Sequence, residues 1–163
     1  MKRNALLVLM ASATLGLSAC AFQPLHGSQQ QVSAMRGITV AVDGQERIDQ
    51  MLAESLNDRF GTPAGGRYRL AAETSVTTSG LGVGADDVAT RSALSLSVDF
   101  SLIDTGSGSP VLTETVRTEA TFDIPLQPYA AVSARRDAEE RAAREAADRI
   151  ALRVARYINR GGQ

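Results

Sequence analysis

Three arginines in this sequence have the chemistry of an anion site: Arg91, Arg135 and Arg136. A guanidinium group presents its N–H donors in a planar fork that matches phosphate oxygens, so several arginines together can bind phosphate bidentately. Arg135 and Arg136 adjoin near the expected start of the last helix, and Arg91 leads into an expected strand. They form a phosphate site if the fold brings them together. Otherwise they pair with nearby acids such as Asp137 or Glu139.

The only cysteine, Cys20, follows a short apolar run at the amino terminus. Lys2 and Arg3 make that terminus positive, and the apolar run over residues 5–17 is shorter than the roughly 20 residues that span a bilayer. A charged start, a short apolar core and small residues before a cleavage site are typical of a secretion signal. Residues 17–20, LSAC, also resemble the lipobox of bacterial lipoproteins.

This lipobox resemblance implies cleavage between Ala19 and Cys20, a diacylglycerol on the thiol and an acyl chain, typically palmitate, on the new amino terminus. Two or more chains give stable anchoring, at about 0.8 kcal/mol per buried methylene, whereas one does not. The alternatives are an ordinary signal peptide or a buried, inert cysteine. Ala21 stands where an aspartate would favour the inner membrane, so we expect the periplasmic face of the outer membrane. The expected division is a signal at 1–19, a lipidated tether at 20–35 and a single domain at 36–163.

Groups that could do catalysis are sparse. The only histidine, His26, lies in the tether, where no cluster of further metal ligands is expected, and the serines within the fold have no histidine to act as their base. The glycines at 80–84 are followed by no Gly-Lys-Ser/Thr, so they do not indicate a phosphate loop. The pair Asp86-Asp87 is expected to be a solvated loop. We therefore expect no enzyme activity, cofactor or metal, and the net charge of −1 does not favour nucleic acid as a partner.

The hydrophobic pattern predicts alternating elements with one apolar face each. In chain order it predicts a strand at 36–42, a helix capped by Asp43 and Glu46 and ending at Gly61, a strand at 68–77, a loop at 78–87, a strand at 94–102, a turn at 104–110, a strand at 112–122 and a helix from Tyr129. In the strand at 94–102, Leu96 and Val98 should be buried. The last helix has an apolar stripe of mainly alanines spaced four apart, which favours packing on a sheet over a coiled coil.

These elements predict an α+β fold: a four-stranded mixed sheet in the order β-α-β-β-β-α, with two helices packed on one face. The strand–helix–strand start favours a parallel pairing of the first two strands, and the last three strands form an antiparallel meander. The other face of the sheet, rich in serine, threonine, glutamate and arginine, is left to water or to a partner.

Several segments resemble the LptE family of lipopolysaccharide-assembly lipoproteins, in its alphaproteobacterial branch. They are LSACAFQPLHG at 17–27, ITVAV at 38–42 with the helix after it, DDVATRSALSLSVDFSLID at 86–104 and FDIPLQPYAAVSARRDAEERAAREAADRI at 122–150. The family pattern Cys-x-Phe-x-Pro-Leu-x-Gly is matched from Cys20 to Gly27. Family members have a four-stranded sheet with two helices on one face.

The resemblance implies a non-enzymatic outer-membrane lipoprotein that plugs the LptD β-barrel and helps to pass lipopolysaccharide to the outer leaflet. It also implies basic residues that contact lipopolysaccharide, a role that falls on Arg135 or Arg136 and on Arg91. The alternatives are a periplasm-facing lipoprotein accessory to an ABC-type lipid transporter and, third, a lipoprotein hydrolase, for which the sequence nominates no catalytic residue.

The lipobox generates a direct test. We expect Cys20→Ala to abolish acylation, because no other thiol exists in the chain to accept the diacylglycerol. Metabolic labelling with a radioactive or alkyne fatty acid should give no labelled band for the variant, and the precursor should remain uncleaved or soluble. Labelling that persists in Cys20→Ala would contradict the lipoprotein assignment.

Overall fold

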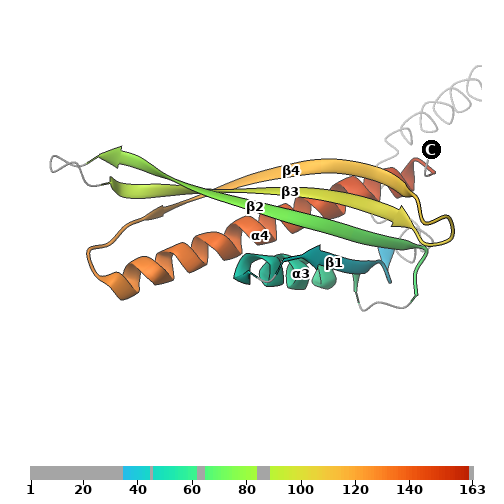
Figure 1. Cartoon of the computed structure of the whole chain (residues 1–163), viewed down its shortest axis with the longest axis horizontal. Coiled ribbons are helices and arrows are strands. Elements are labelled where there is room, and N and C mark those ends of the chain that lie inside the picture. The colour runs from blue at the N-terminus through green and yellow to red at the C-terminus, as the bar shows by residue number, and fades with distance from the viewer. Residues whose placement is uncertain (1–34, 45, 62–64, 84–88, 162–163) are drawn as a thin grey trace, which may run out of the picture.

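The computed structural model describes residues 35–44, 46–61, 65–83 and 89–161. Its elements follow the predicted order: β1 (Thr39–Asp43), α3 (Arg47–Phe60), β2 (Tyr68–Val83), β3 (Ala89–Asp104), β4 (Pro110–Asp123) and α4 (Pro128–Asn159). Figure 1 shows a long, twisted sheet with both helices on one of its faces. The predicted α+β fold is therefore confirmed. Residues 1–34, with Cys20 and His26, and the pair Asp86-Asp87 lie outside the described residues.

The four strands form one sheet in the order β1-β2-β3-β4. β1 pairs parallel with the start of β2, from Thr39 opposite Arg69 to Asp43 opposite Glu73. The remaining neighbours are antiparallel over almost their whole lengths. The parallel first pair and the antiparallel meander both agree with the sequence prediction.

The core lies between the sheet and the helices. Alternate residues of β3 are buried there, and the predicted Leu96 and Val98 are among them. α3 contributes Ile48, Leu52, Leu56 and Phe60 at helical spacing, closing the core beside β1. Burial of such side chains is the main stabilising term of a domain of this size. Among the described helices, none is long and apolar enough to span a membrane.

α4 packs through its alanines, as the spacing predicted. Ala138, Ala142, Ala143, Ala146 and Ala147 are all fully buried, followed by Ile150 and Val154. Because a methyl group is short, the helix backbone lies close to the sheet. Thr118 of β4 is near enough for its hydroxyl to donate to the carbonyl oxygen of Ala142, at 3.1 Å.

Two local predictions were wrong. β2 continues to Val83, so residues 78–83 are strand rather than loop, because they pair with β3 as far as Val83 opposite Ala89. The cap of α3 is Glu46 rather than Asp43, which is the last residue of β1. Asp49 accepts from the backbone N–H of Glu46 at 2.9 Å and from the hydroxyl of Thr74, and this buried carboxylate fixes the start of the helix.

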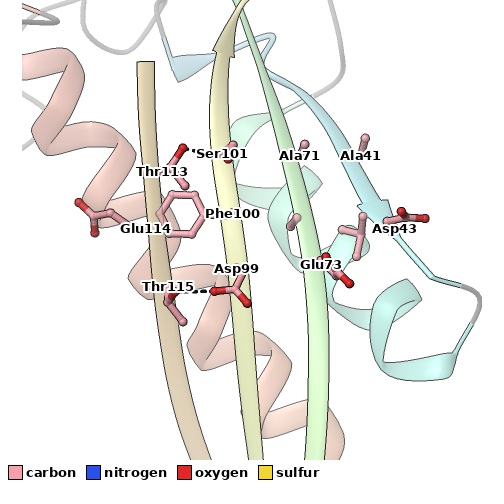
Figure 2. A pocket seen from close by; sticks show the side chains of 12 residues that line it. Ala41, Asp43, Ala71, Glu73, Asp99, Phe100, Ser101, Thr113, Glu114 and Thr115 are labelled. Atoms are coloured by element: carbon pink, nitrogen blue, oxygen red, sulfur yellow. Dashed lines mark hydrogen bonds between the residues drawn. The ribbon is translucent and has the colours of Figure 1, made fainter. Parts of the chain in front are cut away.

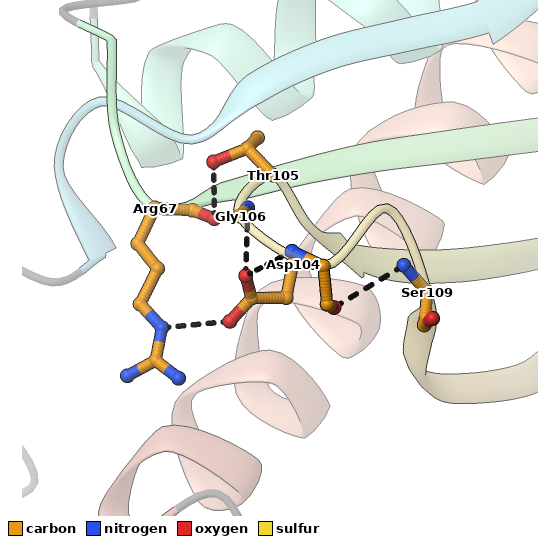
Figure 3. A network of polar contacts seen from close by, with 6 residues as sticks. Arg67, Asp104, Thr105, Gly106 and Ser109 are labelled. Carbon is orange, nitrogen blue, oxygen red and sulfur yellow. Dashed lines mark hydrogen bonds and ion pairs between the residues drawn. The ribbon is translucent and has the colours of Figure 1, made fainter.

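A polar network ties the β3–β4 hairpin to the start of β2, as Figure 3 shows. Arg67 donates to Asp104 at 2.8 Å, and the backbone N–H groups of Gly106 and Ser107 donate to the other carboxylate oxygen. The hydrogen bond from Arg67, followed by that from Gly106, lowers the pKa of the Asp104 carboxyl. Thr105 adds backbone and hydroxyl hydrogen bonds to the carbonyl of Arg67, both at 2.9 Å. The hairpin is thereby held at one end of the sheet.

Candidate functional site

Arg91 lies near the start of β3, directly opposite Asp123 of β4. Its Nε atom donates to the Asp123 carboxylate at 2.9 Å, and both side chains are well exposed, at 58% and 75%. An ion pair this exposed contributes about 0–1 kcal/mol, so a ligand phosphate can replace Asp123 at little cost. Arg91 is therefore paired but available.

Arg135 is paired along its own helix. Its Nε atom donates to Glu139, four residues on, at 3.0 Å. Glu139 also lies 3.9 Å from the Nε atom of Arg47 in α3. For this residue the ion-pair alternative of the sequence analysis is the one that the structure contains.

Arg136 differs from its neighbour. It is exposed, and among the residues that the structure describes no hydrogen bond or ion pair involves its side chain. Adjacent helical residues point about 100° apart, which directs Arg136 away from the contact between Arg135 and Glu139. Of the three predicted arginines, Arg136 is thus the cation that a ligand could bind without displacing a partner.

The expected help from the helix end is not present. α4 begins at Pro128, so Arg135 and Arg136 lie two turns into the helix. At 1.5 Å per residue they are roughly 10 Å along the axis from the free N–H groups of the first turn. The helix dipole acts mainly within that first turn, so a phosphate beside Arg136 does not also bind the helix terminus.

Exposed apolar side chains occur around the same end of the molecule, a feature that the sequence analysis missed. Leu126 and Tyr129 are 94% and 91% exposed, and the others are Leu81, Ile124 and Val132. Leu81 lies near the end of β2, Ile124 and Leu126 lie between β4 and α4, and Tyr129 and Val132 lie in the first turns of α4. Figure 1 shows the end of β2, the start of β3 and the amino-terminal end of α4 at the same end of the molecule. The signal was present in the run IPLQPYAAV, whose apolar residues precede the alanine stripe.

We call this end, with Arg91, Arg135, Arg136 and the five exposed apolar residues, the tip. Arg91 and Arg135 pair with different acids, Asp123 of β4 and Glu139 of α4, and no acid in the described residues bridges two of the three arginines. The tip therefore presents separate cations and apolar side chains on one end of the molecule. Such a surface suits an amphiphile that carries both anionic and apolar groups.

The open face of the sheet has a different character. A hollow of about 600 Å³ crosses all four strands there, and its polar lining includes Asp43, Glu73 and Asp99 from three adjacent strands. Figure 2 shows these carboxylates in one row, with Thr115 donating to Asp99. In the described part of the chain, no three histidine, cysteine or acidic residues form a group that could hold a metal ion.

Comparison with known proteins finds one matching family and several similar structures. The model of the family LptE, described as lipopolysaccharide-assembly, matches residues 35–154. No curated protein sequence matches the chain. The crystal structure of a candidate lipoprotein from Caulobacter crescentus is 33% identical, covers 80% of this chain and 96% of its own, and superposes with a TM-score of 0.64.

Two more distant structures share the fold. Rare lipoprotein B from Shewanella oneidensis is 16% identical over 77% of this chain and 98% of its own, with a TM-score of 0.55. Lipoprotein B from Nitrosomonas europaea, of uncharacterized function, is 11% identical over 78% of this chain and 86% of its own, with a TM-score of 0.57. At these identities the likeness concerns the fold alone.

Proposed function

The chain belongs to the LptE family of lipopolysaccharide-assembly proteins, and from this membership we propose that it is the lipoprotein partner of an LptD-type β-barrel in the outer membrane. The observation that carries the proposal is the extent of the family match, which runs from before β1 to Val154 and so includes all four strands, α3 and most of α4. The 33% identity to the Caulobacter crescentus structure over most of both chains supports it.

The proposed location follows from the amino terminus. Acylated Cys20 would anchor the chain in the outer membrane, with the domain on the periplasmic side. Residues 20–35 would then serve as the tether. The role itself makes and breaks no covalent bond, so it requires binding surfaces rather than a nucleophile, a metal or a cofactor.

The tip is the proposed contact for lipopolysaccharide. This lipid carries phosphate groups next to acyl chains, and the tip carries arginines next to exposed apolar side chains. Arg136 is the first candidate because it has no competing partner among the described residues. Arg91 can exchange the exposed Asp123 for phosphate, whereas Arg135 would have to leave Glu139, whose side chain is largely buried. Phosphate binding by arginine is charge-assisted and bidentate, which would orient the lipid head group.

Co-purification tests the barrel partnership. The full chain with a carboxy-terminal tag, expressed in its own cells and extracted from membranes in mild detergent, should retain an LptD-type barrel in near-equal amount. The matched control is the Cys20→Ala chain, which lacks the lipid anchor. It distinguishes direct association of the chain with the barrel from recovery of both proteins because they share a membrane. Recovery of an inner-membrane ABC-type permease in place of a barrel would contradict the proposal and favour the transporter-accessory alternative.

Charge reversal at the tip tests the ligand contact. We expect Arg136→Glu to weaken binding of purified protein to lipopolysaccharide several-fold at low salt, and less at higher salt, because exposed charges are screened with a Debye length of about 8–10 Å near physiological ionic strength. Arg135→Glu should weaken it less, since Glu139 already neutralises Arg135.

The matched control for this measurement is Arg156→Glu, an exposed arginine near the other end of the same helix. Circular dichroism checks that all three variants fold. If Arg136→Glu and Arg156→Glu bind lipopolysaccharide equally well, the tip is not the ligand site.

A further inference from the structure

The outer edge of β2 is only partly covered. β1 pairs with Arg69–Glu73 and then ends at Asp43. From Thr74 to Leu81, β2 is paired with β3 on one side, and within the described part of the chain no strand lies on the other. Alternate residues of this stretch therefore direct their backbone N–H and C=O groups outward, unpaired.

The opposite edge of the sheet is protected. Arg149 of α4 donates to the carbonyl oxygen of Arg117 in β4 at 2.6 Å, and Arg141 donates to that of Thr121 at 3.1 Å. Arg153 pairs with Glu114 farther along the same strand. Charged side chains that cover a strand edge prevent another strand from adding to it.

Among the residues that the structure describes, no charged side chain covers the β2 edge in this way. Residues 74–81, TSVTTSGL, contain no charge and no proline. Ser75, Thr77 and Ser79 are exposed, and the pairing with β3 runs through this stretch without a bulge. Threonine and valine favour extended backbone, so the stretch is already shaped to receive a neighbour.

A patch of negative charge marks one end of the open edge. Asp43 and Glu73, opposite each other where β1 stops, line a second hollow of about 390 Å³ together with Thr74 and Val76. Both carboxylates are exposed, and among the described residues no cation pairs with either. Figure 2 shows them on adjacent strands, where β1 ends. A segment that lay along residues 74–81 would have one of its ends beside these two charges.

We propose that the open edge of β2 binds an extended segment of another polypeptide, which adds as a strand next to Thr74–Leu81. This segment is uncharged over about six to eight residues, which matches the length of the open edge. It carries a lysine or arginine at the end that lies beside Asp43 and Glu73. A second copy of this edge offers no cation within residues 74–81. A lipid offers no alternating N–H and C=O groups. A basic, strand-forming peptide fits both observations.

A defined peptide tests this. The probe is a fluorescent peptide of two arginines followed by four Thr-Val repeats, added to the purified full chain in detergent. We expect saturable binding by fluorescence anisotropy and slower amide hydrogen exchange confined to residues 74–81. The same peptide with two glutamates in place of the arginines should bind more weakly, and a version with N-methyl groups on alternate backbone amides should not bind.

A matched pair of variants tests the edge itself. Thr77 and Ser95 lie opposite each other on β2 and β3, and both are exposed on the open face. Thr77→Lys places a charge at the edge and should weaken peptide binding by about tenfold or more, whereas Ser95→Lys, one strand inside, should leave it unchanged. Glu73→Gln should weaken binding and reduce its salt dependence.

Three outcomes would overturn the proposal. They are no binding of the arginine peptide, equal loss of binding in Thr77→Lys and Ser95→Lys, or protection of residues 74–81 by dimerisation without peptide. Sedimentation velocity of the unliganded chain detects the last, which would assign the edge to a second copy instead. None of these results depends on whether the barrel partnership is correct.

Discussion

The rest of the structure depends on how closely α4 lies on the sheet. Its buried face is alanine through most of its middle, so the helix backbone approaches β3 and β4 more nearly than leucines would allow. That closeness lets Thr118 reach a helix carbonyl and lets Arg141 and Arg149 reach the carbonyls of β4. α3 is fixed in turn, because Arg59 donates to Asp148 at 2.7 Å and to the carbonyl of Arg144.

The same packing decides which surfaces remain for partners. α3 and α4 cover one face of the sheet and the side chains of α4 protect the β4 edge, while the open face, the tip and the β2 edge stay accessible (Figure 1). These surfaces differ in chemistry: the open face carries a row of carboxylates, the tip carries arginines and apolar residues, and the β2 edge carries backbone groups. The lipid contact and the polypeptide contacts that we propose would each use a separate surface.

The sequence predicted what short-range periodicity determines. The alternation from Leu94 to Leu102 predicts which face of that strand is buried, and the alanine spacing predicts the buried face of the last helix. Both predictions are confirmed. Prediction from the sequence failed where a partner distant in the chain decides the outcome: residues 78–83 are strand because β3 pairs with them, and Glu46 is the cap because Thr74 helps to hold Asp49. For the tip, the sequence could name Arg135 and Arg136 as candidate ligand residues but could not tell which of them has a partner. The structure shows that Glu139 pairs with Arg135, four residues before it on the same helix face, and so leaves Arg136 without a partner among the described residues.

Equilibrium unfolding of Ala142→Leu tests the close contact of α4 most directly. Ala142 is fully buried against the sheet, so the larger side chain should lower the free energy of unfolding by about 1–3 kcal/mol through overpacking. The control is Ala130→Leu, at an exposed position of the same helix, which should change it little. Urea denaturation followed by circular dichroism measures both. A clearly lower midpoint for Ala142→Leu alone is the predicted result; equal midpoints for the two variants would show that the helix does not lie directly on the sheet.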